Sequence, residues 1–420
     1  PIVLQTSAPI EHGYSTKGTL QQWRDNVAIP VAGQNRIAFA LSCAFAGQLL
    51  HLLGERHGGG FHYWGASSMG KSITLAVAGS VWGNQMIKSW RSTDNALENI
   101  ALLHNDSVLC LDEIGESDPR IVGKSIYMLA NGQAKNRMTK TGVNKQAATW
   151  RVMVLSNGEY TIENYLRQAG ETVKAGQEVR LCSIEANAGK NLGIFDSLTL
   201  ADTSAKQAEL LRENTDCYYG NAGMTWLEYL TENKDKVIAQ AHELKRVFLA
   251  DYADLDGQAK RVANRFALVA VAGELASKAK ITGWQQGQAI AAAKACFENW
   301  LSNYGSTGNH EQRQIIKQVQ AFIHANGKSR FSEWKYDGHN STLPNRVGFY
   351  RADDDCYYIY ASLFEKEVCL PFNRKQVAET LDSLNLLNKN KGYQLNVNSS
   401  DRDKKGYFYC IKGAILELEP

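Results

Sequence analysis

The spacing of apolar residues predicts a buried helix near the start of the chain. Apolar side chains recur every three to four positions at Ile37, Leu41, Phe45, Leu49 and Leu52. This is the period at which side chains return to one face of an α-helix. Three successive glycines, Gly58 to Gly60, then break the pattern. We therefore expect residues 1–60 to form a helical segment that packs on the domain beginning at residue 61.

From residue 61 to about 200, short apolar runs alternate with helical patterns. They cover 61–64, 71–82, 94–104, 107–111, 119–130 and 151–156. Such alternation is typical of an α/β domain built on a parallel sheet, in which ligands bind beyond the carboxyl ends of the strands. The sequence therefore predicts an α/β core over 61–200 with its binding site at one edge of the sheet.

Beyond residue 200 the strand patterns fade. Helices are expected over 204–213, 225–250, 256–280 and 285–303. The Gly305-Ser-Thr-Gly308 run favours a linker, because such residues punctuate regular structure. We therefore predict an all-helical domain over 201–305 and a separate domain over 309–420.

The last segment mixes helices with strands. Helices are expected over 310–325, 362–367 and 373–387, and strands near 357–361, 391–397 and 406–412. Val377, Leu381 and Leu384 are spaced to face one core. Basic residues at the start of that helix (Arg374, Lys375) and a possible wing at Lys404-Lys405-Gly406 make the segment resemble a winged helix. Winged helices bind DNA or other proteins, and the acidic run 353–355 leaves both roles open.

Composition limits the kind of protein. The chain has 420 residues, enough for two or three domains, and a net charge of only +3. Affinity for polyanions must therefore come from local patches. No apolar run approaches the length of a membrane span, and the start of the chain does not resemble a signal peptide. We expect a cytoplasmic protein without a membrane partner. Because the chain starts at Pro1 without Met, we also expect it to be a fragment of something longer.

Cysteine and histidine spacing argues against a zinc site. The eight cysteines are scattered and no pair has C-x-x-C spacing, which favours reduced thiols. His57 and His62 flank the glycine run without an obvious third ligand. We therefore expect neither histidine to bind a metal.

The most specific chemical signal is a complete G-x-x-x-x-G-K-S phosphate loop. Its residues are Gly65, Ala66, Ser67, Ser68, Met69, Gly70, Lys71 and Ser72. A strand-like run precedes the loop and a helix-like run follows it, which is the context this motif requires. In such a loop, backbone N–H groups contact the phosphates of a nucleoside triphosphate, Lys71 binds the β- and γ-phosphates, and Ser72 ligates Mg²⁺.

Two later strand-like runs end in polar residues. The first ends in Asp112-Glu113, and we expect it to lie beside the phosphate loop. There Asp112 would hold Mg²⁺, and Glu113 would orient and deprotonate the attacking water. The second ends in Ser156-Asn157-Gly158. Asn157 would hold that water or contact the γ-phosphate, although Asn-Gly also favours a simple turn.

Together these motifs resemble those of an AAA+ ATPase. Gly65–Ser72, Leu109–Glu113 and Leu155–Asn157 resemble Walker A, Walker B and sensor 1. Within that class, the chain is similar to the helicase-like family found with primases of phages and mobile elements. That family is similar to minichromosome-maintenance and superfamily 3 replicative helicases. The segments that carry the resemblance are Leu111–Glu116, Ala130–Arg137, Ser156–Glu159 and Ala175–Leu181. This chain has Asn157-Gly-Glu where many relatives have Thr-Gly-Glu.

The resemblance implies a P-loop NTPase core, an all-α lid and a C-terminal winged-helix domain, with ATP and Mg²⁺ as cofactors. It also implies roles for two arginines. Arg180 would be an arginine finger that stabilises charge on the transferred phosphoryl group in a neighbouring subunit. A surface salt bridge is the alternative for this residue. Arg265 matches the lid arginine called sensor 2, and Arg261, one turn earlier, competes with it.

Residues 119–151 carry seven basic residues and no acidic ones. They are Arg120, Lys124, Lys135, Arg137, Lys140, Lys145 and Arg151. In helicases of this class, the interval 132–149 forms a hairpin that projects into a central pore. Arg137, Lys140 and Lys145 would then contact the DNA backbone without reading its sequence. The alternatives are a solvated loop, or a contact of Lys135 and Arg137 with nucleotide across the subunit interface.

The sequence therefore predicts an ATP-dependent DNA helicase or translocase that acts in replication of a phage or mobile element. We expect a homo-oligomer, a hexameric ring, acting on single-stranded or forked DNA. A primase or polymerase is expected as a further partner. The alternative is an AAA+ loader or regulatory scaffold that binds DNA and nucleotide without unwinding.

Overall fold

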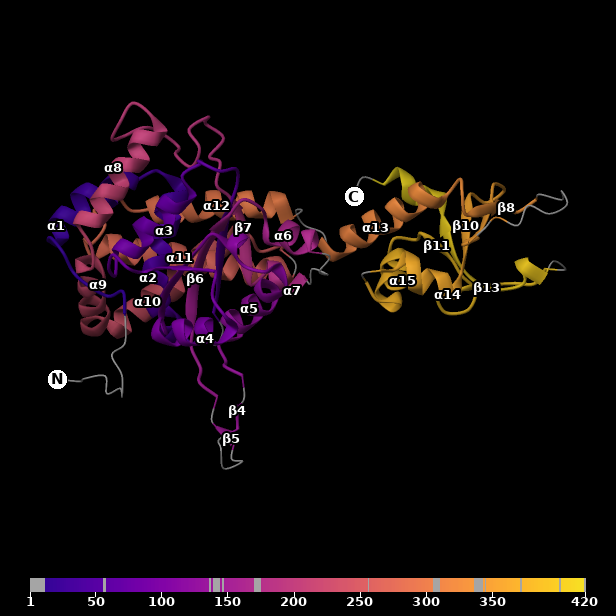
Figure 1. Cartoon of the computed structure of the whole chain (residues 1–420), viewed down its shortest axis with the longest axis horizontal. Helices are drawn as coiled ribbons and strands as arrows, with labels where there is room; N and C mark the ends of the chain where they lie inside the picture. The colour runs from indigo at the N-terminus through magenta and orange to yellow at the C-terminus, as the bar shows by residue number, and fades with distance from the viewer. Residues whose placement is uncertain are drawn as a thin grey trace. The chain divides into compact units, whose positions relative to one another are not determined.

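The chain divides into two compact units, Pro1–Ser306 and Thr307–Pro420 (Figure 1). The computed structural model describes residues 12–55, 58–135, 137–138, 144–145, 147–169, 175–255, 257–304, 310–335, 343, 345–370, 372–399 and 402–418. The expected linker at Gly305–Gly308 lies outside the described residues. Among the described residues, no helix has both the length and the apolar character needed to cross a membrane.

A five-stranded parallel sheet forms the centre of the first unit, in the order β2-β3-β6-β1-β7. The strands are β1 (Gly59–Trp64), β2 (Ile87–Ser89), β3 (Ser107–Asp112), β6 (Val152–Gly158) and β7 (Leu181–Glu185). The runs expected at 61–64, 107–111 and 151–156 correspond to β1, β3 and β6. β6 pairs with both β1 and β3 and separates them.

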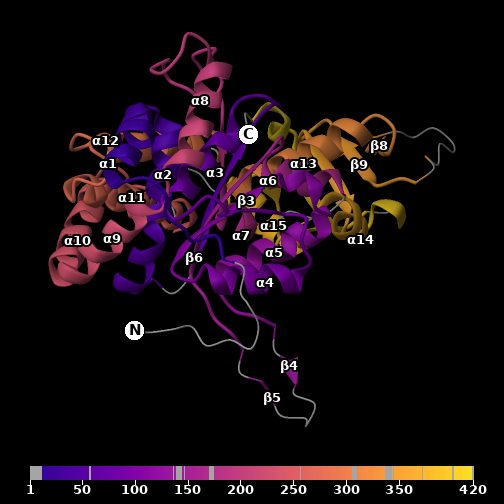
Figure 2. The ribbon, with the colours of Figure 1, turned by 60° about the vertical axis from the view of Figure 1, so that its left-hand side comes forward.

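Helices cover both faces of this sheet (Figure 2). One face packs against α2 (Asn35–Leu52) and α3 (Lys71–Ser80). The other packs against α4 (Asp94–Leu103), α5 (Pro119–Asn131) and α6 (Ile162–Gln168). Successive strand residues point to opposite faces. In β3, Val108 and Cys110 therefore join the core on the α2 side, whereas Leu109 and Leu111 join the core on the α5 side.

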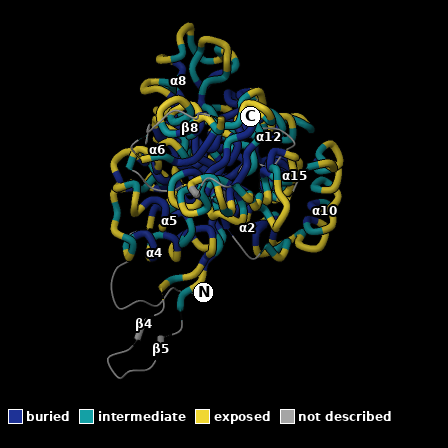
Figure 3. Tube along the Cα trace, turned by 90° about the vertical axis from the view of Figure 1, so that its right-hand side faces the viewer, coloured by how far each residue is buried: buried dark blue, intermediate teal, exposed yellow. Residues whose placement is uncertain are grey.

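A helical region follows the sheet. Its helices are α8 (Ser204–Cys217), α9 (Asn221–Glu232), α10 (Lys234–Ala250), α11 (Gly257–Lys278) and α12 (Gln288–Tyr304). α11 packs on α2, so α2 is buried between α11 and the sheet. Figure 3 shows exposed residues along α8 and α10 and buried residues in the interior.

The single helix expected over 225–250 is wrong, because Asn233 divides it into α9 and α10. The Asn233 backbone leaves the helical region, with φ −119° and ψ 24°. Its side-chain amide donates to the Tyr229 carbonyl over 3.0 Å. Asparagine favours helix ends because its side chain competes for backbone hydrogen bonds.

A two-stranded ribbon, β4 (Arg137–Met138) and β5 (Asn144–Lys145), connects α5 to β6. Its base is closed by an antiparallel bridge between Gln133 and Thr149. Figure 1 shows β4 and β5 standing away from the rest of the first unit. The expected hairpin in the interval 132–149 is therefore present.

The short helices α1 and α7 lie outside these layers. α1 (Leu20–Trp23) starts with a capping box formed by Thr19 and Gln22 and continues as a π-helical turn. α7 (Ala175–Glu178) precedes β7. Trp23 of α1 is fully buried and donates from its ring nitrogen to Ser80 Oγ at the end of α3 over 2.9 Å. The start of the described chain is thereby attached to the α/β core.

The second unit is a six-stranded mixed sheet with helices on one face. The strands are β8 (Phe331–Glu333), β9 (Gly348–Arg351), β10 (Cys356–Tyr360), β11 (Leu387–Asn388), β12 (Leu395–Val397) and β13 (Gly406–Lys412). The helices are α13 (His310–Asn326), α14 (Ala361–Leu363), which continues as a π-helical turn, and α15 (Arg374–Ser383). Their apolar side chains share one core with this face of the sheet.

The prediction for α15 is partly wrong. Val377 and Leu381 are buried as expected, but the helix ends at Ser383 and Leu384 is exposed. The chain turns there, and Leu386 and Leu387 enter the core instead. Arg374 and Lys375 are exposed, and they pair with Glu365 and Glu379 respectively.

Candidate functional site

The predicted phosphate loop leaves the carboxyl end of β1 and leads into α3. Gly70 caps this helix with a left-handed backbone, φ 88°. A Cβ at that position would lie 2.9 Å from Ile194 Cγ2, so only glycine fits without a shift. The amino end of α3 directs its unpaired N–H groups and the positive end of its dipole at the loop. The loop and helix therefore form a cradle suited to phosphate.

Lys71 is held at the centre of this cradle. Its ammonium donates to the carbonyl oxygens of Gly65 and Ala66, each over 2.8 Å. The residue is 7% exposed. Burial lowers the Lys71 pKa, and the nearby carboxylates of Glu113, Glu159 and Asp112 act in the opposite direction. The cation is thus positioned where loop-bound phosphates would lie.

The Asn157 side chain joins the two predicted Mg²⁺ ligands. Its Nδ2 donates to Asp112 Oδ1 over 2.7 Å and lies 3.4 Å from Ser72 Oγ. Its Oδ1 accepts from the Glu113 backbone N–H over 2.7 Å. Asn157 can do this because β6 lies between β1 and β3, so its end is next to both. The structure therefore brings Ser72, Asp112, Glu113 and Asn157 together.

These residues fit a magnesium ion. A serine hydroxyl and a carboxylate are oxygen ligands of the kind Mg²⁺ prefers beside phosphates. Ser72 is exposed toward solvent and Asp112 is half-buried. Asn157 would hold both groups from behind, as outer hydrogen-bond partners orient metal ligands.

Glu113 has an unusual backbone. Its φ of 49° and ψ of 83° lie in the left-handed region, which a non-glycine residue rarely adopts. The Asn157 side chain supports this conformation by accepting from the Glu113 N–H. Glu113 Oε1 also accepts from the Gly115 N–H over 3.2 Å. Such strain is common at functional sites, where it aims a side chain.

A cavity of about 380 Å³ lies over the loop. It is lined by residues 67–73 together with Glu113, Glu159, Ala208 and Arg212. Sequence reasoning missed Glu159 and Arg212. Arg212 lies on α8, and only packing of α8 against α3 brings it to the loop. Glu159 follows Asn157-Gly158 directly, so its proximity to a strand end was the available signal.

His62 lies inside β1 and is fully buried. His57 lies outside the described residues. His62 Nε2 is 2.9 Å from the Tyr160 carbonyl, so this nitrogen carries the proton, and Nδ1 accepts from Ser156 Oγ over 3.0 Å. Trp90 Nε1 donates to the same Ser156 oxygen over 2.8 Å. Burial lowers the His62 pKa to about 4. The neutral ring therefore fixes the segment that carries Asn157 and Glu159.

The structure does not bring Arg180 to the phosphate loop of its own chain. Arg180 precedes β7, whose first residue pairs with Gly60 near the start of β1. The loop follows Trp64, four residues along the strand and about 13 Å away. The guanidinium donates to Gly176 O and Asn131 Oδ1 and lies over the Tyr127 ring. Arg180 therefore lies at the amino ends of the strands, at the edge of the sheet opposite the phosphate loop.

Arg265 lies at this opposite edge as well. Its Nη1 donates to the Val179 carbonyl over 2.6 Å, and its guanidinium packs against the Gly59 backbone. A bulkier residue than glycine at position 59 would collide with it. Arg261 is exposed on the same helix, α11. The structure thus does not place Arg265 at the cavity over the phosphate loop of its own chain.

The basic stretch 119–151 is partly neutralised. Lys135 pairs with Asp94 over 2.8 Å, and Arg151 binds both carboxylate oxygens of Asp106. The backbones of Arg137 and Lys145 pair directly across the ribbon. Lys140 lies outside the described residues. Fewer free charges therefore remain than the seven basic residues suggested.

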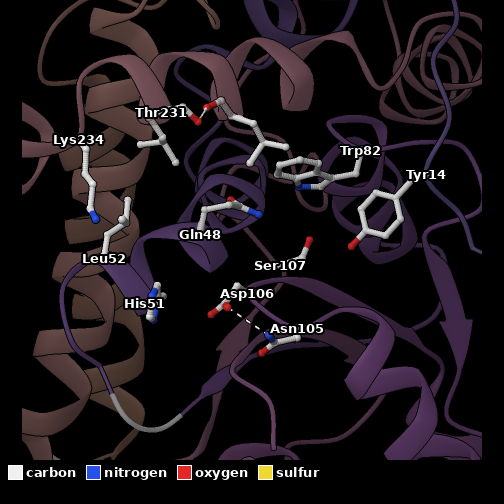
Figure 4. Close-up of a pocket in the computed structure, with 12 residues that line it drawn as sticks. Tyr14, Gln48, His51, Leu52, Trp82, Asn105, Asp106, Ser107, Thr231 and Lys234 are labelled. Atoms are coloured by element: carbon white, nitrogen blue, oxygen red, sulfur yellow. Dashed lines mark hydrogen bonds between the residues drawn. The ribbon is translucent and has the colours of Figure 1, made fainter. Parts of the chain in front are cut away.

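A larger cavity, of about 570 Å³, lies at the other end of β3 (Figure 4). Tyr14, Trp82 and Gln48 line it together with Ser107, the first residue of β3. Asp112, the last residue of that strand, faces the phosphate loop. Among the described residues that line this cavity there is no predicted site residue and no glycine. Size alone therefore does not identify the functional site.

Comparison with known proteins agrees with this architecture. Residues 1–149 match the model of a domain of unknown function, DUF927. The chain is similar to the solved structure of "SCCmec type IV Cch - active helicase", with 21% identity and a TM-score of 0.70. This similarity covers 99% of the present chain and 75% of that chain. No curated protein matches. The chain therefore shares a fold with that helicase: a parallel α/β core, a helical region and a mixed C-terminal sheet.

Proposed function

We propose that this chain is an ATP-dependent DNA helicase or translocase of the AAA+ class. The observation that carries the proposal is the Asn157 side chain, which lies between Ser72 and Asp112 beside the phosphate loop. This arrangement supports hydrolysis of a magnesium-bound nucleoside triphosphate. The shared fold with a protein described as an active helicase supports DNA unwinding as the purpose of that hydrolysis.

Each residue of the site has a chemical role in this proposal. The N–H groups of residues 65–72 and the Lys71 ammonium bind the phosphates. Ser72 and Asp112 hold Mg²⁺, which neutralises charge on the phosphates. Glu113 accepts the proton of the attacking water, and Asn157 keeps that carboxylate and the water aligned. Arg212 adds positive charge from the helical lid.

Arg180 is proposed to act on a neighbouring subunit. Its position at the edge opposite the phosphate loop supports a role in trans, because a ring can present that edge to the next site. Positive charge from such an arginine stabilises the transferred phosphoryl group. This completes the catalytic site only in a homo-oligomer, for which we propose a hexameric ring. Arg265 has its contacts at the same edge, away from the phosphate loop of its own chain. A sensor 2 role for this arginine would therefore have to act on the site of a neighbouring subunit.

The β4–β5 ribbon is proposed to contact single-stranded DNA. Its separation from the body of the unit and the basic residues Arg137, Lys140 and Lys145 support this role. Contacts with phosphates would be independent of base sequence.

The domain roles proposed are an N-terminal helical segment (1–60), an ATPase core (61–200), a lid (201–305) and a winged helix (309–420). A primase or polymerase is the proposed replication partner.

Strand displacement on forked DNA tests this function. The chain should release a labelled strand with ATP and Mg²⁺, and neither Lys71→Ala nor Glu113→Gln should do so. The Glu116→Gln variant, a neighbouring exposed carboxylate, is the matched control and should remain active. If the wild type hydrolyses ATP but displaces no strand on forks of either polarity, the loader or scaffold alternative replaces the helicase.

A further inference from the structure

A cluster of three metal-ligating side chains lies in the second unit, remote in sequence from the phosphate loop. Asp354, Cys356 and Cys410 each offer one ligand atom, and these atoms all lie within 4.8 Å of one another. Asp354 lies in the turn before β10, Cys356 starts β10, and Cys410 lies in β13. The two cysteines are 54 residues apart in the sequence.

The register of the sheet creates this cluster. β10 and β13 are antiparallel, and Tyr358 pairs directly with Cys410. Because side chains alternate between faces, Cys356, Tyr358 and Cys410 share one face. Phe349 and Phe408 complete a small apolar core there. Both cysteines are fully buried, whereas Asp354 is only partly buried. Solvent can therefore approach the cluster from the Asp354 side.

One carboxylate oxygen of Asp354 is available to a ligand. Oδ2 accepts hydrogen bonds from the Tyr358 hydroxyl, over 2.7 Å, and from the Arg351 guanidinium. Oδ1 is buried and has no hydrogen-bond partner in the described part of the chain. An unsatisfied buried carboxylate oxygen is costly, and a cation would satisfy it.

The surroundings of the thiols also suit a bound metal. Asn388 Nδ2 donates to Cys356 Sγ over 3.0 Å, a contact that stabilises a thiolate. In the metal-free chain, the Cys356 thiol donates to the Asp354 carbonyl over 3.2 Å. Neighbouring groups thus hold the proposed ligands in place through hydrogen bonds, as the outer partners of metal ligands do in established metal sites.

Charge balance identifies the class of metal. Two thiolates and one carboxylate carry three negative charges, and the Arg351 guanidinium bonded to Asp354 carries one positive charge. A divalent cation makes this group neutral. Soft sulfur ligands favour zinc over magnesium or calcium. In a tetrahedral zinc site the sulfur atoms lie about 3.8 Å apart, so two sulfur atoms that lie within 4.8 Å of each other need to approach by at most about 1 Å.

We propose that Asp354, Cys356 and Cys410 bind one zinc ion, with water as the fourth ligand. The ion joins the turn before β10 to β10 and β13, and thereby stabilises the mixed sheet of the second unit. This inference does not depend on the ATPase site. The cysteine spacing in the sequence argued against a zinc site, whereas strand pairing brings these two distant cysteines together.

The full-length chain tests the proposal directly. We expect one zinc per chain after purification under reducing conditions and dialysis, measured by atomic emission. Replacement by cobalt should produce a thiolate-to-cobalt charge-transfer absorption. Because both thiols are buried, the readout is the change on removing zinc: a chelator should make Cys356 and Cys410 of the wild type react faster with an alkylating reagent, read by mass spectrometry, while the exposed Cys217 reacts equally with and without zinc.

Variants separate ligation from folding. Cys410→Ser and Asp354→Asn should each lower zinc affinity at least about tenfold. Asp354→Asn keeps the size of the side chain, so it remains informative if Cys410→Ser fails to fold. Cys217→Ser and Asp353→Asn are the controls and should retain zinc. Lack of zinc in the reduced wild type, or zinc whose removal leaves the reactivity of Cys356 and Cys410 unchanged, would overturn the proposal. Formation of a Cys356–Cys410 disulfide despite saturating zinc would overturn it equally.

Discussion

The Asn157 amide donates a hydrogen bond to the Asp112 carboxylate over 2.7 Å, across the boundary between β6 and β3. The same side chain reaches Ser72 and supports the strained Glu113 backbone. One amide thus links the two residues proposed to bind Mg²⁺ and the residue proposed to activate water. Its substitution should therefore affect chemistry more strongly than substrate binding.

Asn157→Ala should lower kcat for ATP hydrolysis about 100-fold, with a smaller change in KM, because water and general base lose their alignment. Steady-state ATPase kinetics measure this split. Asn164→Ala, an exposed asparagine on α6, is the control and should behave as wild type. Thermal unfolding of both variants identifies any loss of fold. An Asn157→Ala enzyme with normal kcat would remove this residue from the site.

Arg180→Ala should be inactive alone, yet regain part of its ATPase activity when mixed with inactive Glu113→Gln. In mixed rings, an intact arginine from one variant meets an intact Glu113 from the other, so some composite sites are complete. ATPase activity over a range of mixing ratios measures the effect, with subunit exchange verified by native mass spectrometry. Complete absence of rescue in verified mixed oligomers would argue that Arg180 does not act in trans.

Arg212→Ala should weaken ATP binding about tenfold, because a hydrogen bond to a charged phosphate contributes about 1.5 kcal/mol. Lys206→Ala is the matched control, since Lys206 is on the same helix but pairs with Glu209. Titration with a fluorescent ATP analogue measures both variants. Equal affinities for the wild type and Arg212→Ala would show that α8 does not contribute to the nucleotide site.

Combined Lys140→Ala and Lys145→Ala substitutions should weaken single-stranded DNA binding in a salt-dependent way. Loss of two phosphate contacts should reduce the slope of log affinity against log salt by about 1.4. Fluorescence anisotropy at several salt concentrations measures this slope. Lys236→Ala, an exposed lysine on α10, should leave it unchanged. An unaltered slope in the double variant would mean that the ribbon is a solvated loop that does not contact DNA.

His62 should make the fold less stable in mild acid. Its pKa is about 4 in the folded chain and about 6.5 when unfolded, so the unfolded state binds the additional proton between these values. Stability from this residue is complete above pH 6.5 and decreases as the pH falls toward 4. The expected loss at pH 5 is about 2 kcal/mol.

Urea unfolding at pH 7.5 and pH 5 measures this effect. His62→Gln should be less stable than wild type at pH 7.5, because the Ser156 and Tyr160 contacts are altered, but should lose less stability on acidification. His51→Gln, an exposed histidine at the end of α2, is the control and should keep the wild-type pH dependence. An identical loss in wild type and His62→Gln would contradict this account.

Local sequence was sufficient for much of the proposed nucleotide site. Gly65–Ser72, Asp112-Glu113 and Asn157 each follow an apolar run, and parallel strands bring their carboxyl ends to one edge. Their proximity therefore followed from strand direction alone. Most helices were predicted because periodicity and turn residues are local properties. The β4–β5 ribbon, by contrast, was expected only from the resemblance to helicases.

Only the tertiary structure decided how these elements are arranged. Strand order placed β6 between β1 and β3, which lets one asparagine contact both predicted Mg²⁺ ligands. Packing of α8 brought Arg212 to the loop, whereas the position of β7 took Arg180 to the opposite edge. Strand pairing in the second unit likewise assembled Asp354, Cys356 and Cys410. Short-range patterns in the sequence specify where an element begins and which face is apolar. Contacts between distant residues depend instead on which elements become neighbours, and that is settled only when the whole core packs.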